Sequence, residues 1–255
     1  MTDASLLELA FGLAARAGQR IMEIRARGFD TTFKADASPV TIADQQAEHI
    51  ITEALRAATP GIPVVAEEAV AAGAAPAAGA AFWCVDPLDG TREFTAGRDD
   101  FAVCIGLVRQ GRPVLGVVAA PARNVFWGGI VGEGACRRHG ADASVPISAR
   151  RPPPEGLTVV ASRHHGKDPR MEPFLASRHV AEMRNIGSAL KFCLLAEGEA
   201  DLYPRFGPTM EWDTCAAQAV LEAAGGGVRS IEGDAPLAYG KPGWLNPFFY
   251  ATGRR

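Results

Sequence analysis

The sequence predicts an α/β fold in two halves, and three patterns carry that prediction. Residues 3–27 place apolar side chains at helical spacing, so that one face of a long helix is buried. Short apolar segments that end in acidic residues are typical of buried strands, and residues 101–131 resemble an antiparallel meander. After residue 155, strand and helix segments alternate. We therefore expect an α+β N-terminal half and a smaller α/β C-terminal half.

The N-terminal half is predicted to begin with two helices. Thr41 is a suitable N-cap for the second helix, and Pro60 and Gly61 end it. Residues 69–80 are rich in Ala, Gly and Pro, which favours a mobile surface loop. A tight turn at Gln110-Gly111 joins two strands of the meander. The predicted helices are 3–27 and 41–58, and the predicted strands are 63–66, 81–85, 101–109, 113–120 and 124–131.

A proline-rich segment at 150–155 indicates a linker between the two halves. We place the boundary there, with an N-terminal subdomain at 1–150 and a C-terminal subdomain at 151–255 that closes the active site. The second half is predicted to contain strands 157–161 and 200–203 and helices 188–197 and 214–224. Three consecutive glycines, residues 225–227, end the last helix.

Composition and charge exclude several classes of protein. The 255 residues carry 26 basic and 29 acidic side chains, without a basic stripe, which argues against a nucleic-acid binder. No apolar stretch reaches the ~18 residues that a membrane-spanning helix needs, and the N-terminus is unlike a signal peptide. The five cysteines are scattered, which favours neither disulfides nor a zinc site. A reducing cytoplasm is the expected location.

The strongest chemical signal is the segment Asp86-Pro-Leu-Asp-Gly-Thr91, directly after a predicted buried strand. Pro87 and Gly90 permit a sharp turn that brings Asp86, Asp89 and the Leu88 carbonyl to one side. Such an all-oxygen set suits a hard cation such as Mg²⁺. The backbone N–H groups that follow begin a helix, where a phosphate can bind. The alternative interpretation is an ordinary type I turn with Asp-Gly.

Acidic residues also follow strand 63–66 and precede helix 214–224. Glu67 and Glu68 end the strand, and Asp213 precedes the helix. A buried carboxylate is costly unless it is paired or binds a cation, so convergence of these groups with Asp86 and Asp89 favours a metal site. Taken singly, the glutamates could cap an exposed strand end, and Asp213 could cap its helix.

Several of these segments resemble the inositol monophosphatase superfamily. The resemblance covers nearly the whole chain and rests on Ala66–Glu68, Trp83–Thr91 and Glu211–Asp213. Other segments are similar to the CysQ branch, the 3′(2′),5′-bisphosphate nucleotidases. They are Lys34–Asp44, Gly187–Cys193, Ala200–Thr214 and Tyr239–Phe248.

The resemblance implies a layered α-β-α-β-α sugar-phosphatase fold and a lithium-sensitive phosphatase with two Mg²⁺ ions, with room for a third. The implied reaction converts 3′-phosphoadenosine 5′-phosphate to AMP and phosphate, in sulfate-assimilation housekeeping, with the sulfated nucleotide as a second candidate substrate. It also allows a homodimer and peripheral placement at the inner face of the inner membrane. The alternatives are an inositol monophosphatase or another phosphatase of small sugar or amino-alcohol phosphates, and a member that binds RNA or the transcription machinery.

Carried over by resemblance, the metal ligands are Glu67, Asp86, the Leu88 carbonyl, Asp89 and Asp213. Asp86 bridges the two ions, and a third ion would lie near Glu67, which is counted among the catalytic residues. Asp44 and Thr91 are the dyad that orients and deprotonates the attacking water. Without the resemblance, Asp44 would be interpreted as a carboxylate that complements the helix dipole.

The substrate contacts implied by the resemblance come from both halves. Ser188 is expected to N-cap a helix with Lys191 one turn further on, and Arg205 is expected to bind a 5′-phosphate. The implied set is Glu67, Leu88, Asp89, Gly90, Thr91, His165, Ser188, Lys191, Arg205 and Asp213. The alternatives are a solvated helix face for Lys191 and an exposed loop for His165.

Overall fold

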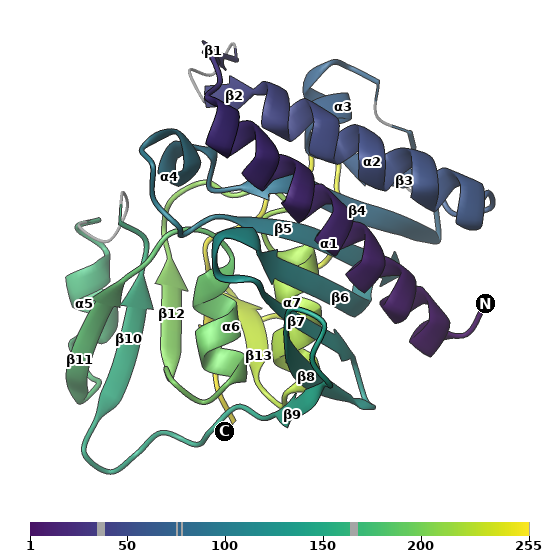
Figure 1. The fold of residues 1–255 in the computed structure, drawn as a ribbon. Helices are drawn as coiled ribbons and strands as arrows, with labels where there is room; N and C mark the ends of the chain where they lie inside the picture. Colours follow the sequence, from purple (N-terminus) through teal and green to yellow (C-terminus); the bar gives the residue numbers. More distant parts are fainter. Residues whose placement is uncertain (35–38, 75, 78, 164–167, 255) are drawn as a thin grey trace.

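Two β-sheets alternate with layers of helices in the computed structural model of the protein (Figure 1). The structure describes residues 1–34, 39–74, 76–77, 79–163 and 168–254. From one side to the other the layers are α1 with α2, a seven-stranded sheet, α6 with α7, a five-stranded sheet, and α5 (Figure 1). The predicted five-layer α/β fold is therefore confirmed.

The first layer consists of α1 (Asp3–Arg27) and α2 (Ile42–Ala58). Thr41 is the N-cap of α2, as predicted, and its hydroxyl accepts the N–H of Ala43. The short strands β1 (Thr31–Phe33) and β2 (Pro39–Thr41) pair antiparallel between the two helices. Among the described residues, none of the helices combines the length and apolar character needed to cross a bilayer.

The seven-stranded sheet has its strands in chain order, and only the β3–β4 pair is parallel among its neighbours. Its strands are β3 (Val64–Ala66), β4 (Ala81–Asp89), β5 (Ala102–Arg109), β6 (Arg112–Ala120), β7 (Val125–Ile130), β8 (Gly134–His139) and β9 (Val145–Ile147). Short helices α3 (Glu67–Ala71), α4 (Thr91–Thr95) and η1 (Pro121–Arg123) interrupt the series.

Both faces of the sheet are buried along β4 to β7, which explains the continuous apolar runs in those strands. Along β4, Phe82 and Cys84 pack with the α7 side, whereas Trp83 and Val85 pack with α1 and α2. This alternation is the two-residue period of a strand. The carboxyl end of β4 therefore emerges between two apolar layers, where the acidic residues lie.

The second sheet has the order β11-β10-β12-β14-β13. Its strands are β10 (Leu157–Ala161), β11 (Val180–Asn185), β12 (Leu202–Arg205), β13 (Gly227–Ser230) and β14 (Phe249–Thr252), and its helices are α5 (Met171–Leu175), α6 (Leu190–Ala196) and α7 (Cys215–Ala223). Phe192 of α6 stacks on Phe249, whereas Phe174 of α5 meets Tyr250. Because neighbouring strand residues face opposite ways, α5 and α6 lie on opposite faces.

The start of α7 lies directly against the seven-stranded sheet at Gly116 of β6. A Cβ atom at this position would lie 2.3 Å from the carbonyl oxygen of Ala216. Only a residue without a side chain allows this backbone approach. Gly116 therefore sets how closely α7, and the segment that precedes it, can approach the sheet.

Several predicted boundaries need correction. The strand predicted at 81–85 continues as β4 to Asp89, and residues 69–71 of the predicted 69–80 loop belong to α3. Residues 75 and 78 of that loop lie outside the described residues. The strand predicted at 200–203 is shifted to Leu202–Arg205. The predicted subdomain boundary falls between β9 and β10, which belong to different sheets, and the independence of the two halves stays a prediction.

Candidate active site

The metal loop begins where β4 departs from regular pairing with β5. Asp86 and Asp89 pair with Cys104 and Ala102, so the register shifts between them. The N–H of Leu88 donates to Asp86 Oδ1 at 3.0 Å. Gly90 then adopts φ +91°, a left-handed conformation, and α4 begins at the next residue. The turn that the sequence predicts is thus an irregular strand end, followed by a glycine that redirects the chain.

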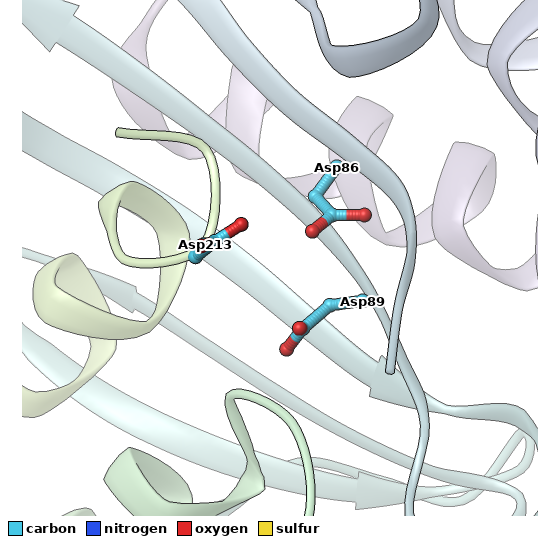
Figure 2. A group of neighbouring side chains, drawn as sticks. All are labelled: Asp86, Asp89 and Asp213. Carbon is cyan, nitrogen blue, oxygen red and sulfur yellow. The ribbon is translucent and has the colours of Figure 1, made fainter. Parts of the chain in front are cut away.

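Three aspartates from two distant segments meet at this point (Figure 2). Asp86, Asp89 and Asp213 each offer one carboxylate oxygen, and these oxygens lie within 4.8 Å of one another. The carboxylate of Asp213 accepts the N–H of Met210 at 2.8 Å. The alternative that Asp213 caps α7 is wrong, because Thr214 occupies the N-cap position and makes no side-chain cap bond.

Burial raises the pKa of all three carboxyl groups, and the charges of neighbouring carboxylates add to the rise. Burial raises the pKa of Asp213 to about 8, with a further contribution from the charges of Asp89 and Glu67. Burial also raises the pKa of Asp89 to about 6, opposed by the nearby Lys191 ammonium. Complete burial and the neighbouring carboxylates raise the pKa of Asp86 well above its usual range. A bound cation would relieve this repulsion, and the all-oxygen donor set fits Mg²⁺.

Glu67 borders the same cavity and is held by a lysine that the sequence analysis did not assign. It is the first residue of α3, and its Oε1 lies 2.7 Å from Lys34 Nζ. Lys34 Nζ also lies 2.6 Å from Glu68 Oε1. Burial opposes the charge of Lys34, yet the two carboxylates together raise its pKa. The glutamates therefore do more than cap a strand end.

Asp44 and Thr91 are in direct contact, as the dyad assignment requires. The Thr91 hydroxyl lies 2.9 Å from Asp44 Oδ1 and 3.0 Å from the Leu88 carbonyl oxygen. Asp44 Oδ2 accepts the N–H and the hydroxyl of Thr41, which completes a capping box on α2. Burial raises the pKa of Asp44, and these hydrogen bonds oppose the shift. Asp44 thus both stabilises the start of α2 and contacts Thr91.

A basic region lines the same cavity as the aspartates. Lys191 is 4 % exposed, which excludes the solvated-face alternative, and its Nζ contacts the carbonyl oxygens of Ile186 and Ser188. Burial lowers the pKa of Lys191 to about 8, and the charge of Asp89 opposes this. Within the described part of the chain, the buried Nε–H of Arg205 has no hydrogen-bond partner. Two cationic groups therefore line the cavity, and each has an N–H that can still donate a hydrogen bond to a ligand.

Ser188 does not N-cap α6 as predicted. The N-cap is Ala189, whose N–H donates to the Asp89 carboxylate. Ser188 precedes it at φ +54°, and its hydroxyl accepts the N–H of Leu190 at 3.3 Å. This turn brings the start of α6 onto the metal loop.

Most of the predicted site residues line one cavity of about 680 Å³. Asp44 is not among the lining residues, but it is hydrogen-bonded to Thr91, which is. His165 lies outside the described residues. The predicted residues that line it are Glu67, Asp86, Leu88, Asp89, Gly90, Thr91, Ser188, Lys191, Arg205 and Asp213. Sequence analysis assigned no role to Lys34 or Glu211, although both lie within the segments that carry the resemblance.

The model of the inositol monophosphatase family matches residues 3–253. The chain belongs to this family. Its members are metal-dependent, and the three-aspartate group of this chain could hold a metal ion. The 3′(2′),5′-bisphosphate nucleotidase CysQ of Escherichia coli K12 is 41% identical over 247 residues, which cover 96% of this chain and 98% of that protein. The CysQ of Buchnera aphidicola is 34% identical, covering 97% and 93%.

Solved structures of the family share the fold over nearly the full length. CysQ of Bacteroides thetaiotaomicron superimposes with a TM-score of 0.82 at 35% identity and covers 98% of both chains. The inositol monophosphatase of Anabaena gives 0.76 at 25% identity, covering 98% of this chain and 91% of that one. Identity is higher to the first structure than to the second.

Proposed function

We propose that the protein is a Mg²⁺-dependent 3′(2′),5′-bisphosphate nucleotidase that converts 3′-phosphoadenosine 5′-phosphate to AMP and phosphate. The observation that carries this proposal is one cavity that is lined by both acidic and basic groups. Asp86, Asp89 and Asp213 form its acidic side, and Lys191 and Arg205 form its basic side. A substrate with two phosphates matches that arrangement, and the relatives named CysQ support the same assignment.

The acidic side would hold the metal. Glu67, Asp86, Asp89, Asp213 and the Leu88 carbonyl supply only oxygen donors, as Mg²⁺ requires. When bound, two Mg²⁺ ions would lower the pKa of a water and neutralise charge on the phosphoryl group and the leaving oxygen. A third ion near Glu67 would compete with Lys34 for the same carboxylate.

The dyad would align the water that attacks phosphorus. The Thr91 hydroxyl proton points to Asp44 or the Leu88 carbonyl, so a lone pair of its oxygen is available to the water. The water proton would pass to Thr91 Oγ1 while the Thr91 proton moves to Asp44 Oδ1. The new P–O bond would form as the bond to the ribose 3′-oxygen breaks, and the leaving oxygen would take up a proton from solvent to become the 3′-hydroxyl.

The basic side would bind the phosphate that is not cleaved. Lys191 and Arg205 would each give charge-assisted hydrogen bonds to the 5′-phosphate. Within the described residues, the hydrogen bonds of both side chains go to backbone carbonyl oxygens and none to a carboxylate, so both can turn to an anion. Such contacts are of no use to an inositol monophosphate, which carries a single phosphate.

A substrate panel tests the proposal. Phosphate release with Mg²⁺ is measured from 3′-phosphoadenosine 5′-phosphate, its 2′-phosphate isomer, the sulfated nucleotide, inositol 1-phosphate and fructose 1,6-bisphosphate. We expect the highest kcat/KM for the bisphosphate nucleotide. An equal or higher value for inositol 1-phosphate would favour the inositol monophosphatase alternative instead.

A further inference from the structure

The segment that carries Asp213 lies between regular elements. It follows the end of β12 at Arg205 and precedes the start of α7 at Cys215. Asp213 accepts the N–H of Met210, so the aspartate is fixed relative to its own segment. Its position relative to Asp86 must come from whatever holds residues 209–214 in place.

The connection from β13 to β14 supplies that support through its residues 239–246, the C-terminal loop. The N–H of Glu211 donates to the Trp244 carbonyl at 2.8 Å, and the N–H of Asn246 donates to the Thr209 carbonyl at 2.9 Å. The Asn246 amide also donates to the Met210 carbonyl at 2.7 Å and to Thr214 Oγ1 at 3.0 Å. One side chain therefore ties together residues on both sides of Asp213.

Glu211 makes the second connection between the segment and the C-terminal loop. Its carboxylate is fully buried and accepts the N–H of Gly240 at 2.6 Å and that of Lys241 at 3.0 Å. Lys241 Nζ lies 2.6 Å from Glu211 Oε1. A buried carboxylate is tolerated only with such partners, and all three donors come from the loop.

The same loop also touches the strand that carries Asp86. The Trp244 ring packs edge-on against Phe82 of β4, with 5.8 Å between ring centroids. Tyr239 donates its N–H to the carbonyl of Gly111, at the turn between β5 and β6. The loop is thus fixed to the seven-stranded sheet on one side and to the Asp213 segment on the other.

We propose that the C-terminal loop sets the position of Asp213 relative to Asp86 and Asp89, with Glu211 and Asn246 as positioning residues for metal binding. The inference rests on the proposed metal-dependent function. Neither residue lines the cavity; both act through the segment that carries Asp213. Groups that orient metal ligands typically change metal affinity about 10–100-fold when removed.

Mn²⁺ binding to the dialysed full-length protein tests the inference without turnover. The free Mn²⁺ signal in electron paramagnetic resonance gives Kd for the wild type and Asn246→Ala. Because Asn246 is uncharged, this substitution leaves the charge of the site unchanged. We expect Kd to rise about 10-fold, with the circular dichroism spectrum preserved.

Two further variants separate positioning from general loss of stability. Glu211→Gln is compared with Asp201→Asn, since Asp201 is an equally buried carboxylate, held by Arg150 and the Thr158 N–H. It precedes β12, at the opposite end of that strand from Arg205. Both variants should lower Tm, but only Glu211→Gln should weaken Mn²⁺ binding.

Asn246→Asp provides a check if the alanine variant does not fold. It keeps the shape, removes the amide donor and adds a negative charge, which on electrostatics alone would tighten Mn²⁺ binding. Weaker binding supports the positioning role, whereas tighter binding contradicts it. Unchanged Kd in the Asn246 and Glu211 variants, or an equal loss in Asp201→Asn, would overturn the inference. Absence of Mn²⁺ binding to the wild type would overturn the proposed function itself.

Discussion

The acidic and basic sides of the cavity differ in how their charges are balanced. Asp86, Asp89 and Asp213 accept backbone N–H groups, and burial raises their pKa values, with a further rise from neighbouring carboxylates. Lys191 is buried like Asp86, but it donates to backbone carbonyls, and Arg205 keeps a buried N–H without a partner in the described chain. Backbone dipoles therefore orient the charges on each side without neutralising them.

The difference indicates the order in which metal ions and substrate bind. The acidic side repels phosphate groups and the basic side attracts them, so a substrate with two phosphates gains access to the aspartates only after cations are bound there. The net charge of −3 adds to this repulsion. Metal binding and anion binding should therefore depend on different residues, and the following experiments probe that separation.

Removal of the metal should have the largest effect. Dialysis against EDTA should abolish phosphate release, and Mg²⁺ should restore it, because the three aspartates cannot accommodate an anionic phosphate without a cation. Li⁺ should suppress the restored activity in competition with Mg²⁺. Full activity in the chelator, measured as phosphate release, would contradict the metal assignment.

Substitutions on the acidic side should separate water activation from metal binding. Thr91→Ala should lower kcat about 10²–10⁴-fold without rescue by Mg²⁺, because it removes the contact with Asp44 and no metal-binding carboxylate. Asp44→Asn should behave alike, and the double variant should be little worse than either. Asp213→Asn should instead be partly rescued by high Mg²⁺. The measurement is kcat against Mg²⁺ concentration for all four variants.

Rescue of Thr91→Ala by Mg²⁺ would contradict the dyad. So would a double variant that shows the product of the two single losses. Asp44 would then keep only its role in the capping box of α2.

Arg205→Ala should affect one substrate class only. Loss of a charge-assisted hydrogen bond is worth ~1.5–3 kcal/mol, so kcat/KM for the bisphosphate nucleotide should fall roughly 10–100-fold. Hydrolysis of a small monophosphate such as inositol 1-phosphate should change little. Arg229→Ala is a suitable control, because Arg229 pairs with Asp234 in the connection that follows β13. Equal losses on both substrates would instead assign Arg205 to the fold or the metal site.

The smallest expected effect is on the pH dependence of stability. Asp89 and Asp213 have folded-state pKa values of about 6 and 8, above the ordinary ~4, so the folded state favours their protonated forms. Their contribution to the free energy of unfolding is fully present below pH ~4, where both groups are protonated. It is lost as pH rises through those values. The Tm of metal-free protein should therefore fall between pH ~5 and ~8, less steeply in Asp213→Asn, and Mg²⁺ should reduce the fall. A metal-free Tm that rises over this range would contradict the raised pKa values.

Periodicity and local chemistry were sufficient to predict most of the N-terminal half. The spacing in α1, the cap at Thr41 and the turn at Gln110-Gly111 all depend on short-range effects, and all agree with the structure. The sequence analysis did not predict β8, β9, β11, β13 or β14. Strand β11 shows why, because five of its six residues are exposed and lack the apolar alternation of a half-buried strand.

The site was predicted by resemblance more than by pattern. The signal of Asp86-Pro-Leu-Asp-Gly is local, but its meeting with Asp213 depends on packing between segments that are far apart in the chain, since 123 residues separate Asp89 from Asp213. Local reasoning also misplaced the N-cap of α6 at Ser188, where the backbone has φ +54° and the next residue, Ala189, donates its N–H to the distant Asp89. Lys34 and Glu211 could not be assigned roles because their partners are distant or belong to loops.

The glycine of β6 that lies beneath α7 has a consequence for mutational tolerance. A methyl group at Gly116 would act as a spacer between the sheet and the helix, because the nearest atoms are backbone atoms that cannot rotate away. The helix would have to move outward and take Asp213 with it, while Asp86 and Asp89 stayed on their strand. A position remote from any ligand would thereby behave in a mutational scan like a residue of the metal site.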